Sequence, residues 1–145
     1  MSLLDDNNEL LVEIELYYKY KKIDNGKKLL IVEDEKAKKL LKNGDKEIQK
    51  ISTKWRILNW EEQNEVSNKS TQIINQSTGQ RQFNIILYRD TIIKRCLREW
   101  DLTMNEKPVP VTPEFINKLP GSIIMELYNK FEGVMDYTEE EVKNS

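Results

Sequence analysis

Few side chains in this sequence could carry chemistry. Cys96 is the one cysteine among 145 residues, and histidine does not occur. A single cysteine cannot form an intrachain disulfide, and without histidine the chain can build neither a Cys/His zinc site nor a histidine general base. The acids cluster in solvated contexts such as Glu61-Glu62 and Glu139–Glu141, and their spacing does not indicate two carboxylates facing one cleft. We therefore expect no catalytic residues and no enzyme.

The sequence also lacks the motifs of common cofactor sites. Its five glycines are scattered and form no phosphate-binding loop, and its acids do not follow the alternating pattern of a calcium loop. The apolar runs, such as Leu29–Val32, are far shorter than the roughly 20 residues that span a bilayer. We expect no cofactor, no metal and no membrane segment.

Charge divides the chain into acidic and basic stretches, although the net charge is only −2. Residues 1–18 carry five acids and no base, residues 19–56 have a net charge of +7, and residues 99–145 have one of −6. A basic stretch can bind nucleic acid, but these lysines fit a strand edge and a solvated helix face. The sequence pI of 5.4 is also far below that of typical nucleic-acid-binding domains, so we do not expect a nucleic-acid partner.

The first part of the sequence has the alternation typical of strands. Residues 11–32 predict a β-hairpin around Asp24-Asn25-Gly26, because Asn and Gly tolerate the turn's positive φ. Asp34 is expected to cap a short helix that ends near Leu41. Residues 48–58 fit both helical and alternating spacing, and their β-branched content favours a strand over the second half.

Helix-start signals mark the second part of the sequence. The side chain of Asn59 can accept from the backbone N–H of Glu62, whose carboxylate can accept from the Asn59 N–H, so this capping box predicts a helix beginning at Trp60. Further along, Thr112 is expected to cap a short helix with Pro113 in its first position. These residues are predicted to be structural.

The longest helix is predicted over residues 84–100, where apolar side chains form one core-facing stripe, namely Ile85, Ile86, Ile92, Ile93, Cys96, Leu97 and Trp100. Cys96 lies in this stripe and is expected to be a small buried hydrophobe. Trp100 closes the stripe and, like the other tryptophans, is expected to anchor the core. Arg89 falls in the middle of the stripe, so it is either a partly buried ion-pair partner or a group that binds another protein.

A last helix is predicted after Pro120, with one apolar face formed by Ile123, Ile124, Leu127 and Phe131. Such a face either completes the core or binds a partner, and these four residues are candidate partner-binding residues together with Arg89.

These elements predict an α+β fold with an N-terminal β-hairpin and short strands followed by a small helical bundle. Residues 1–8 are expected to be flexible, and residues 9–133 to form one domain, β-rich over 9–58 and helical over 59–133. The acidic residues 134–145 are expected to be disordered.

Three motifs follow one another within residues 54–132. They are Lys54-Trp-Arg-Ile-Leu-Asn-Trp-Glu-Glu-Gln, then Cys96-Leu-Arg-Glu-Trp-Asp-Leu, then Lys107-Pro-Val-Pro-Val-Thr-Pro-Glu. In this order they resemble tail assembly chaperones of tailed phages. In the family, a Leu-Thr-Trp-Gly-Glu-Gln-like helix start precedes a Trp-Asp/Asn-Leu element and a Gly-Lys-Pro-Val-Pro-Val-Thr-like loop. Here Asn59 stands for the capping Thr, Glu61 for Gly, and Glu106 for the Gly before the lysine.

The resemblance implies a non-enzymatic chaperone in the host cytoplasm that keeps the tape measure protein soluble until the tail-tube protein displaces it. It leaves open whether the chain forms a homo-oligomer. Two other functions stay open: a structural virion component of the tail, connector or baseplate, and, less favoured, a small nucleic-acid-binding regulator.

Overall fold

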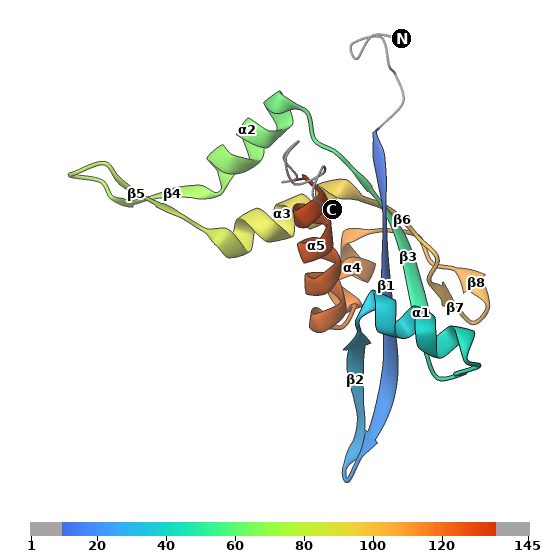
Figure 1. Cartoon of the computed structure of the whole chain (residues 1–145). Helices are drawn as coiled ribbons and strands as arrows, with labels where there is room; N and C mark the ends of the chain where they lie inside the picture. The colour runs from blue at the N-terminus through green and yellow to red at the C-terminus, as the bar shows by residue number, and fades with distance from the viewer. Residues whose placement is uncertain (1–9, 136–145) are drawn as a thin grey trace, which may run out of the picture.

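The computed structural model describes residues 10–135. The protein has the predicted α+β fold, in which an antiparallel sheet built largely from N-terminal strands is packed with C-terminal helices (Figure 1). The segment 1–8, predicted to be flexible, and residues 136–145 of the predicted acidic tail lie outside the described residues.

The central sheet has four strands in the order β2-β1-β3-β6, and every neighbouring pair is antiparallel. The strands are β1 (Leu11–Ile23), β2 (Gly26–Val32), β3 (Gln49–Arg56) and β6 (Leu97–Trp100). The predicted hairpin is confirmed, with β1 and β2 joined at Asp24-Asn25. Strand pairing is staggered, because β3 pairs with β1 from Leu11 to Tyr18 whereas β2 pairs with it from Tyr17 to Ile23. The outer half of the hairpin therefore extends beyond β3, at the bottom of Figure 1.

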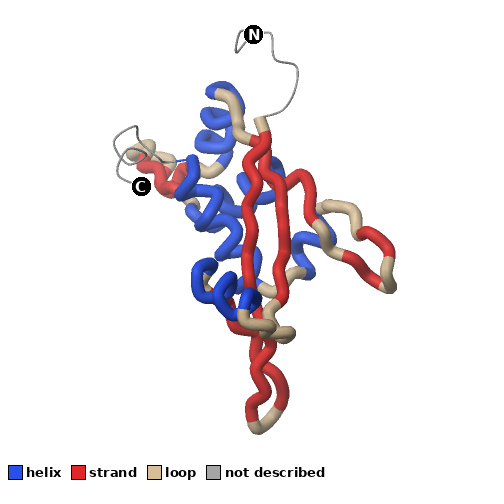
Figure 2. Tube along the Cα trace, turned by 45° about the vertical axis from the view of Figure 1, so that its right-hand side comes forward, coloured by secondary structure: helices blue, strands red, loops and turns tan. Residues whose placement is uncertain are grey.

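The main core lies between one face of the sheet and four helices: α2 (Trp60–Lys69), which contributes Val66, α3 (Ile85–Cys96), α4 (Pro113–Lys118) and α5 (Gly121–Met135). The alternating side chains of β3 confirm the predicted strand, because Ile51, Thr53 and Trp55 are buried. A second, smaller cluster forms around Tyr17, on the other face of β1, where Ala37 of α1 (Asp34–Lys42) covers it. Figure 2 shows the strands in red with the helices in blue packed along them.

The predicted caps are present. Asn59 Oδ1 accepts from the Glu62 N–H at 2.9 Å and the Glu62 carboxylate accepts from the Asn59 N–H at 3.3 Å, so α2 (Trp60–Lys69) begins with a capping box. Thr112 Oγ1 accepts from the Phe115 N–H at 3.2 Å at the start of α4, with Pro113 in the first helical position. Both signals act within four residues, which explains why they can be recognised locally.

The predicted helix over residues 84–100 is too long, and its predicted core-facing stripe is wrong at its start, because Ile85 and Ile86 are exposed. α3 ends at Cys96, and the next four residues form β6, which pairs with the free edge of β3 so that Trp100 lies opposite Thr53. Pairing with this edge satisfies backbone groups that a continued helix would have satisfied internally, and it overrides the helical spacing of the side chains.

The predicted division into a β-rich first part and a helical second part is also too simple. Residues 59–133 contain β6 and two small hairpins as well as helices. The hairpins are β4 (Thr71–Asn75) with β5 (Gln80–Phe83), and β7 (Thr103–Met104) with β8 (Lys107–Pro108). α5 continues to Met135, so the first two residues of the predicted tail are helical.

Asp34 is not the cap of α1 that the sequence predicts. Glu33 occupies the N-cap position without a side-chain capping bond, and Asp34 is the first residue of the helix. Its carboxylate instead accepts hydrogen bonds from Lys130 of α5, a residue far from it in the sequence.

Candidate protein-binding surface

The apolar face of α5, predicted as a candidate partner surface, belongs to the core. Ile123, Leu127 and Phe131 are buried in the main cluster, and the Phe131 ring stacks on Trp55 of β3 with centroids 4.8 Å apart. Ile124 is partly buried and packs against the same cluster. The sheet face needs this helix as its cover, so Ile123, Leu127 and Phe131 are not available to a partner in the folded protein.

Arg89 is partly buried on α3, as its place in the stripe predicts. It forms no ion pair with any residue between 10 and 135. Burial raises the pKa of the nearby Tyr128 of α5, and the charge of Arg89 opposes this increase only weakly. The Tyr128 hydroxyl donates to Glu132 at 2.6 Å. The role of Arg89 as a contact for another protein stays a prediction.

The tryptophans differ in their surroundings. Trp55 is fully buried, and its indole N–H donates to Thr53 Oγ1 at 2.8 Å. Trp100 is partly buried and donates to the Val109 carbonyl at 2.6 Å, which ties β6 to the loop before α4. Trp60 is not the core anchor that we predicted, because 76% of its surface is exposed. It is the first residue of α2, and the face that this helix buries is instead marked by Val66.

Cys96 is a buried core residue, as predicted. Burial raises the pKa of its thiol to about 11. The thiolate, which is the reactive form of cysteine, is therefore suppressed at neutral pH.

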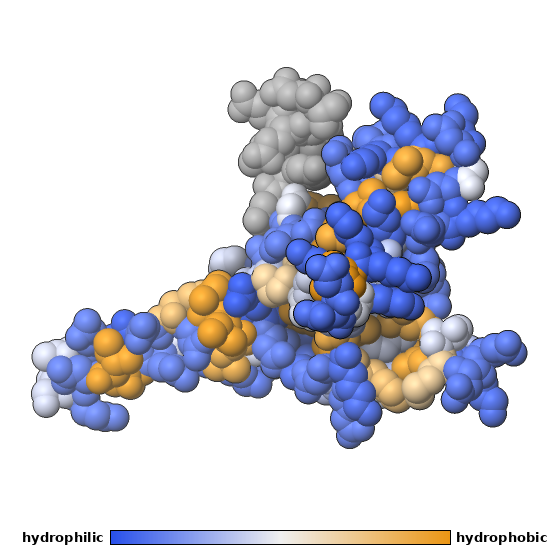
Figure 3. All heavy atoms as spheres, turned by 90° about the horizontal axis from the view of Figure 1, so that it is seen from below, coloured by the Kyte–Doolittle hydropathy of each residue, from blue (hydrophilic) through white to orange (hydrophobic). Residues whose placement is uncertain are grey.

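A group of six exposed large apolar side chains lies on a projecting arm that the sequence did not reveal. We define the arm as residues 71–87, comprising β4, β5 and the first turn of α3, and it is the segment at the far left of Figure 1. Its exposed large apolar side chains are Ile73, Ile74, Phe83, Ile85, Ile86 and Leu87. Figure 3 shows them as orange patches along the lobe that extends to the left.

The root of the arm is held in place by hydrogen bonds. The Asn84 N–H donates to the Ser70 carbonyl at 2.7 Å, and the Asn84 side chain caps α3 by accepting from the Leu87 N–H at 3.0 Å. Ser70 is fully buried and its hydroxyl donates to the Val66 carbonyl at 2.8 Å. These bonds fix where the arm leaves the body of the protein.

Almost every residue of the arm's two strands is exposed. The pairing of β4 with β5 shifts register between Ile73 and Asn75, and both Ile73 and Ile74 are more than half exposed at this irregularity. The hairpin ends in a polar turn, where Asn75 Oδ1 accepts from the Ser77 N–H at 3.0 Å and Gly79 adopts φ +69°. A two-stranded hairpin with no cover on either face is marginally stable in water, so this surface is suited to contact another molecule. The signal in the sequence was the β-branched pair at 73–74, inside a stretch that otherwise has turn composition.

Ion pairs link the helix before the arm to the helix after it and to the sheet. Arg95 of α3 pairs with Glu65 of α2 at 2.9 Å, and Arg56 of β3 makes a two-pronged contact with the Glu62 carboxylate at 2.8 and 2.5 Å. The Arg56 guanidinium is the main cause that lowers the pKa of Glu62 to about 2. Ion pairs and hydrogen bonds thus connect α2 to α3 and to β3 at the base of the arm.

Within residues 10–135 the structure brings together no group of three metal-ligating side chains. None of its described helices is long and apolar enough to cross a membrane. The chain matches no protein-family pattern, no curated protein and no solved structure.

Proposed function

We propose that this protein is a non-enzymatic tail assembly chaperone of a tailed phage, which binds the tape measure protein in the host cytoplasm and keeps it soluble until tail-tube protein replaces it. The proposal combines the resemblance of residues 54–132 with one structural observation, the exposed apolar arm. Ile86 is 69% exposed and is one of six large apolar residues that share this projection.

The arm is suited to an apolar helical client. An amphipathic helix buries its apolar face in a partner through residues spaced three or four positions apart. Ile85 and Ile86 on α3 and Ile73 on β4 offer apolar side chains from two different elements, separated by a polar turn. The remaining surface is strongly charged, since 33% of all residues are Asp, Glu, Lys or Arg, and this charge favours solubility of the complex.

The test is co-expression with a helical fragment of the tape measure protein from the same genome. The double substitution Ile73→Ser and Ile86→Ser should leave the chaperone folded but leave the fragment insoluble, because it removes apolar surface only from the arm. The matched control is Leu41→Ser with Met104→Ser, which removes two exposed apolar residues elsewhere and should keep the fragment soluble. Equal behaviour of the two double variants would contradict the assignment of the arm.

A structural virion component would also project arms, and location separates the two functions. A chaperone should be absent from purified virions, whereas a tail, connector or baseplate subunit is present in fixed copy number. Detection of stoichiometric protein in purified virions by mass spectrometry would overturn the proposed function.

A further inference from the structure

The outer half of the β1–β2 hairpin has an open strand edge. β3 pairs with β1 only as far as Tyr18, so among residues 10–135 no strand covers the side of residues 19–23 that faces away from β2. In antiparallel pairing, alternate residues direct their N–H and C=O groups to opposite sides of the strand. Every second residue of this segment therefore directs backbone donors and acceptors toward the open side.

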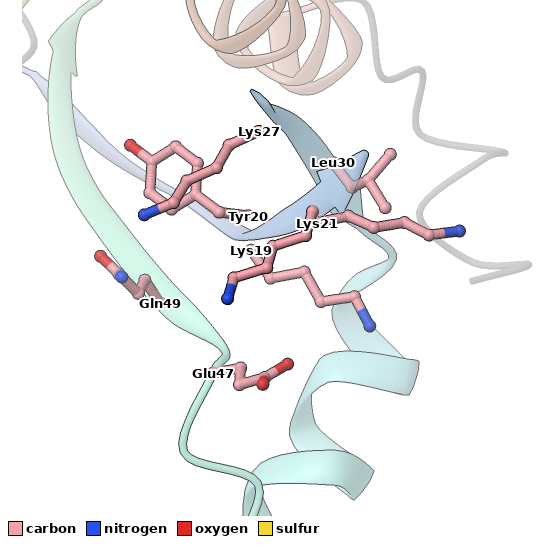
Figure 4. Close-up of a pocket in the computed structure, with 8 residues that line it drawn as sticks. Lys19, Tyr20, Lys21, Lys27, Leu30, Glu47 and Gln49 are labelled. Carbon is pink, nitrogen blue, oxygen red and sulfur yellow. The ribbon is translucent and has the colours of Figure 1, made fainter. Parts of the chain in front are cut away.

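A cleft of about 670 Å³ lies along this edge. Its walls include Lys19, Lys21 and Lys22 of β1, Lys27 of β2, and Glu47 and Gln49 at the start of β3. Figure 4 shows these side chains around the hairpin, with Lys21 extending past Leu30 of β2 and away from Gln49 of β3. We call this feature the lysine cleft.

The charge of the lysine cleft is not balanced within the described part of the chain. None of its four lysines forms an ion pair with a residue between 10 and 135, and Glu47 is the one acid in its walls. An anionic ligand would relieve the mutual repulsion of these lysines. An open strand edge in addition selects an extended peptide, which adds main-chain hydrogen bonds as a further strand.

We propose that the lysine cleft binds the acidic segment 136–145 of a second copy of this chain as an added strand. That segment has four acids and one lysine, so its charge is opposite to that of the cleft. In an extended peptide, Glu139 and Glu141 share one face, with the same spacing as Lys19 and Lys21 on β1. Glu140 then lies on the other face, where Lys22 and Lys27 lie opposite each other in the hairpin.

The segment 136–145 is long enough to pair along this edge. Its connection to the end of α5, however, favours binding to the cleft of a second copy over binding to the cleft of the same chain. Ten extended residues reach up to about 33 Å, and the five-residue edge is about 16 Å long. Gly133 and Val134 line a pocket together with Glu13 and Glu15 of β1, while Lys19 lies about 13 Å farther along the strand. Three residues separate Met135 from Glu139, the first of the three glutamates, and the four steps between these two Cα atoms span about 13 Å at full extension, which leaves no slack for crossing from α5 to the β3 side. In Figure 1, α5 also runs away from the hairpin tip.

Such an interface is heterologous, because the donor segment and the lysine cleft are different surfaces. Head-to-tail contacts of this kind produce rings or open chains, so self-association should increase with protein concentration and weaken with salt.

The first test is sedimentation velocity of the full chain at low ionic strength. The wild type should form concentration-dependent species larger than a monomer. Replacing Glu139, Glu140 and Glu141 with Gln, or Lys19 and Lys21 with Glu, should give monomers under the same conditions. Two controls make matched charge changes elsewhere: Gln at Glu35, Glu61 and Glu106, and Glu at Lys36 and Lys39 of α1, all of them exposed. Monomeric wild type at all concentrations, or equal loss of assembly in the controls, would overturn the proposal.

The second test uses a fluorescent peptide of residues 136–145 and a single-stranded DNA decamer. The peptide should bind the full chain in a saturable manner, at least tenfold more weakly after Lys19→Glu with Lys21→Glu, and at least tenfold more weakly when alternate peptide nitrogens are methylated. Unchanged binding of the methylated peptide would show that no strand is added. Tighter binding of the DNA than of the peptide would instead make the cleft a nucleic-acid site. Either result overturns the proposal.

Discussion

The indole ring of Trp55 stacks on the ring of Phe131, with centroids 4.8 Å apart and planes inclined by 23°. Trp55 is fully buried near the end of β3, and Phe131 lies in the second half of α5. This contact joins the strand that precedes the capping box to the last helix. It explains why the apolar face of α5 is a structural element of the body rather than a docking surface.

Removing the Phe131 ring should destabilise the whole protein. Phe131→Ala in a packed core is expected to cost about 3–5 kcal/mol, because it loses apolar burial and leaves a cavity. Chemical denaturation followed by circular dichroism measures this loss. The control is Phe83→Ala on the arm, where 48% of the residue is exposed, and it should cost much less. Comparable losses in both variants would show that Phe131 does not lie in the core.

Lys130 connects α5 to the start of α1 and to β1. Its ammonium group donates to both carboxylate oxygens of Asp34, at 2.7 and 2.9 Å, and to the Glu15 carbonyl at 2.8 Å. Lys130→Met keeps the alkyl stem but removes these donors, and should lower the free energy of unfolding by about 1–2 kcal/mol. Lys42→Met, at an exposed position of α1, serves as the control and should be near neutral. If urea titrations gave Lys130→Met the same free energy of unfolding as the wild type, the contact would be contradicted.

Acid should selectively remove the contribution of Glu62. Its pKa is lowered from 4.5 to about 2, chiefly by the hydrogen bonds from Arg56. A depressed carboxyl pKa means that the ionised form stabilises the fold above pH 4.5, and that this contribution is lost as pH falls from about 4.5 to about 2. Glu62→Gln should therefore be less stable than wild type at pH 6, by about 1–3 kcal/mol, and the difference should shrink toward pH 2. A difference that does not change with pH would rule out the charged pair as its origin.

Cys96 should react slowly with thiol reagents. Burial raises its pKa to about 11, so the native protein at pH 8 should be labelled by an aromatic disulfide reagent only on the timescale of unfolding. Labelling in denaturant is the control and should be complete within the mixing time of the assay. Fast labelling of the native protein would show that the thiol is accessible.

Glycine should improve the turn between β7 and β8. Asn105 and Glu106 both have positive φ, at 53° and 65°, which matches a hairpin turn that favours Asn-Gly. Left-handed backbone costs a non-glycine residue about 1–2 kcal/mol, partly offset by the greater freedom of glycine in the unfolded chain. Glu106→Gly should thus raise the melting temperature, whereas Glu114→Gly at the start of α4 should lower it. A decrease on Glu106→Gly would mean that the Glu106 side chain contributes more than the strained backbone costs.

The amino-acid sequence by itself determined the elements whose signals lie within a few residues. The turn at Asp24-Asn25, the capping box of Asn59 and Glu62, and the Thr112-Pro113 helix start need only neighbouring backbone groups, so propensity and spacing predict them correctly. The alternation of β3 and the burial of Cys96 follow in the same way from the period of the side chains.

The tertiary structure alone decided which partners these elements take. Leu97 to Trp100 became a strand because the edge of β3 was free, and the face of α5 became core because the sheet required a cover. The edge of β1 is open beside Lys19 because the pairing of β3 with β1 ends at Tyr18. Ile73 and Ile86 are exposed because the arm extends away from the body of the protein. These outcomes depend on contacts between residues far apart in the chain, whose energies no local pattern contains.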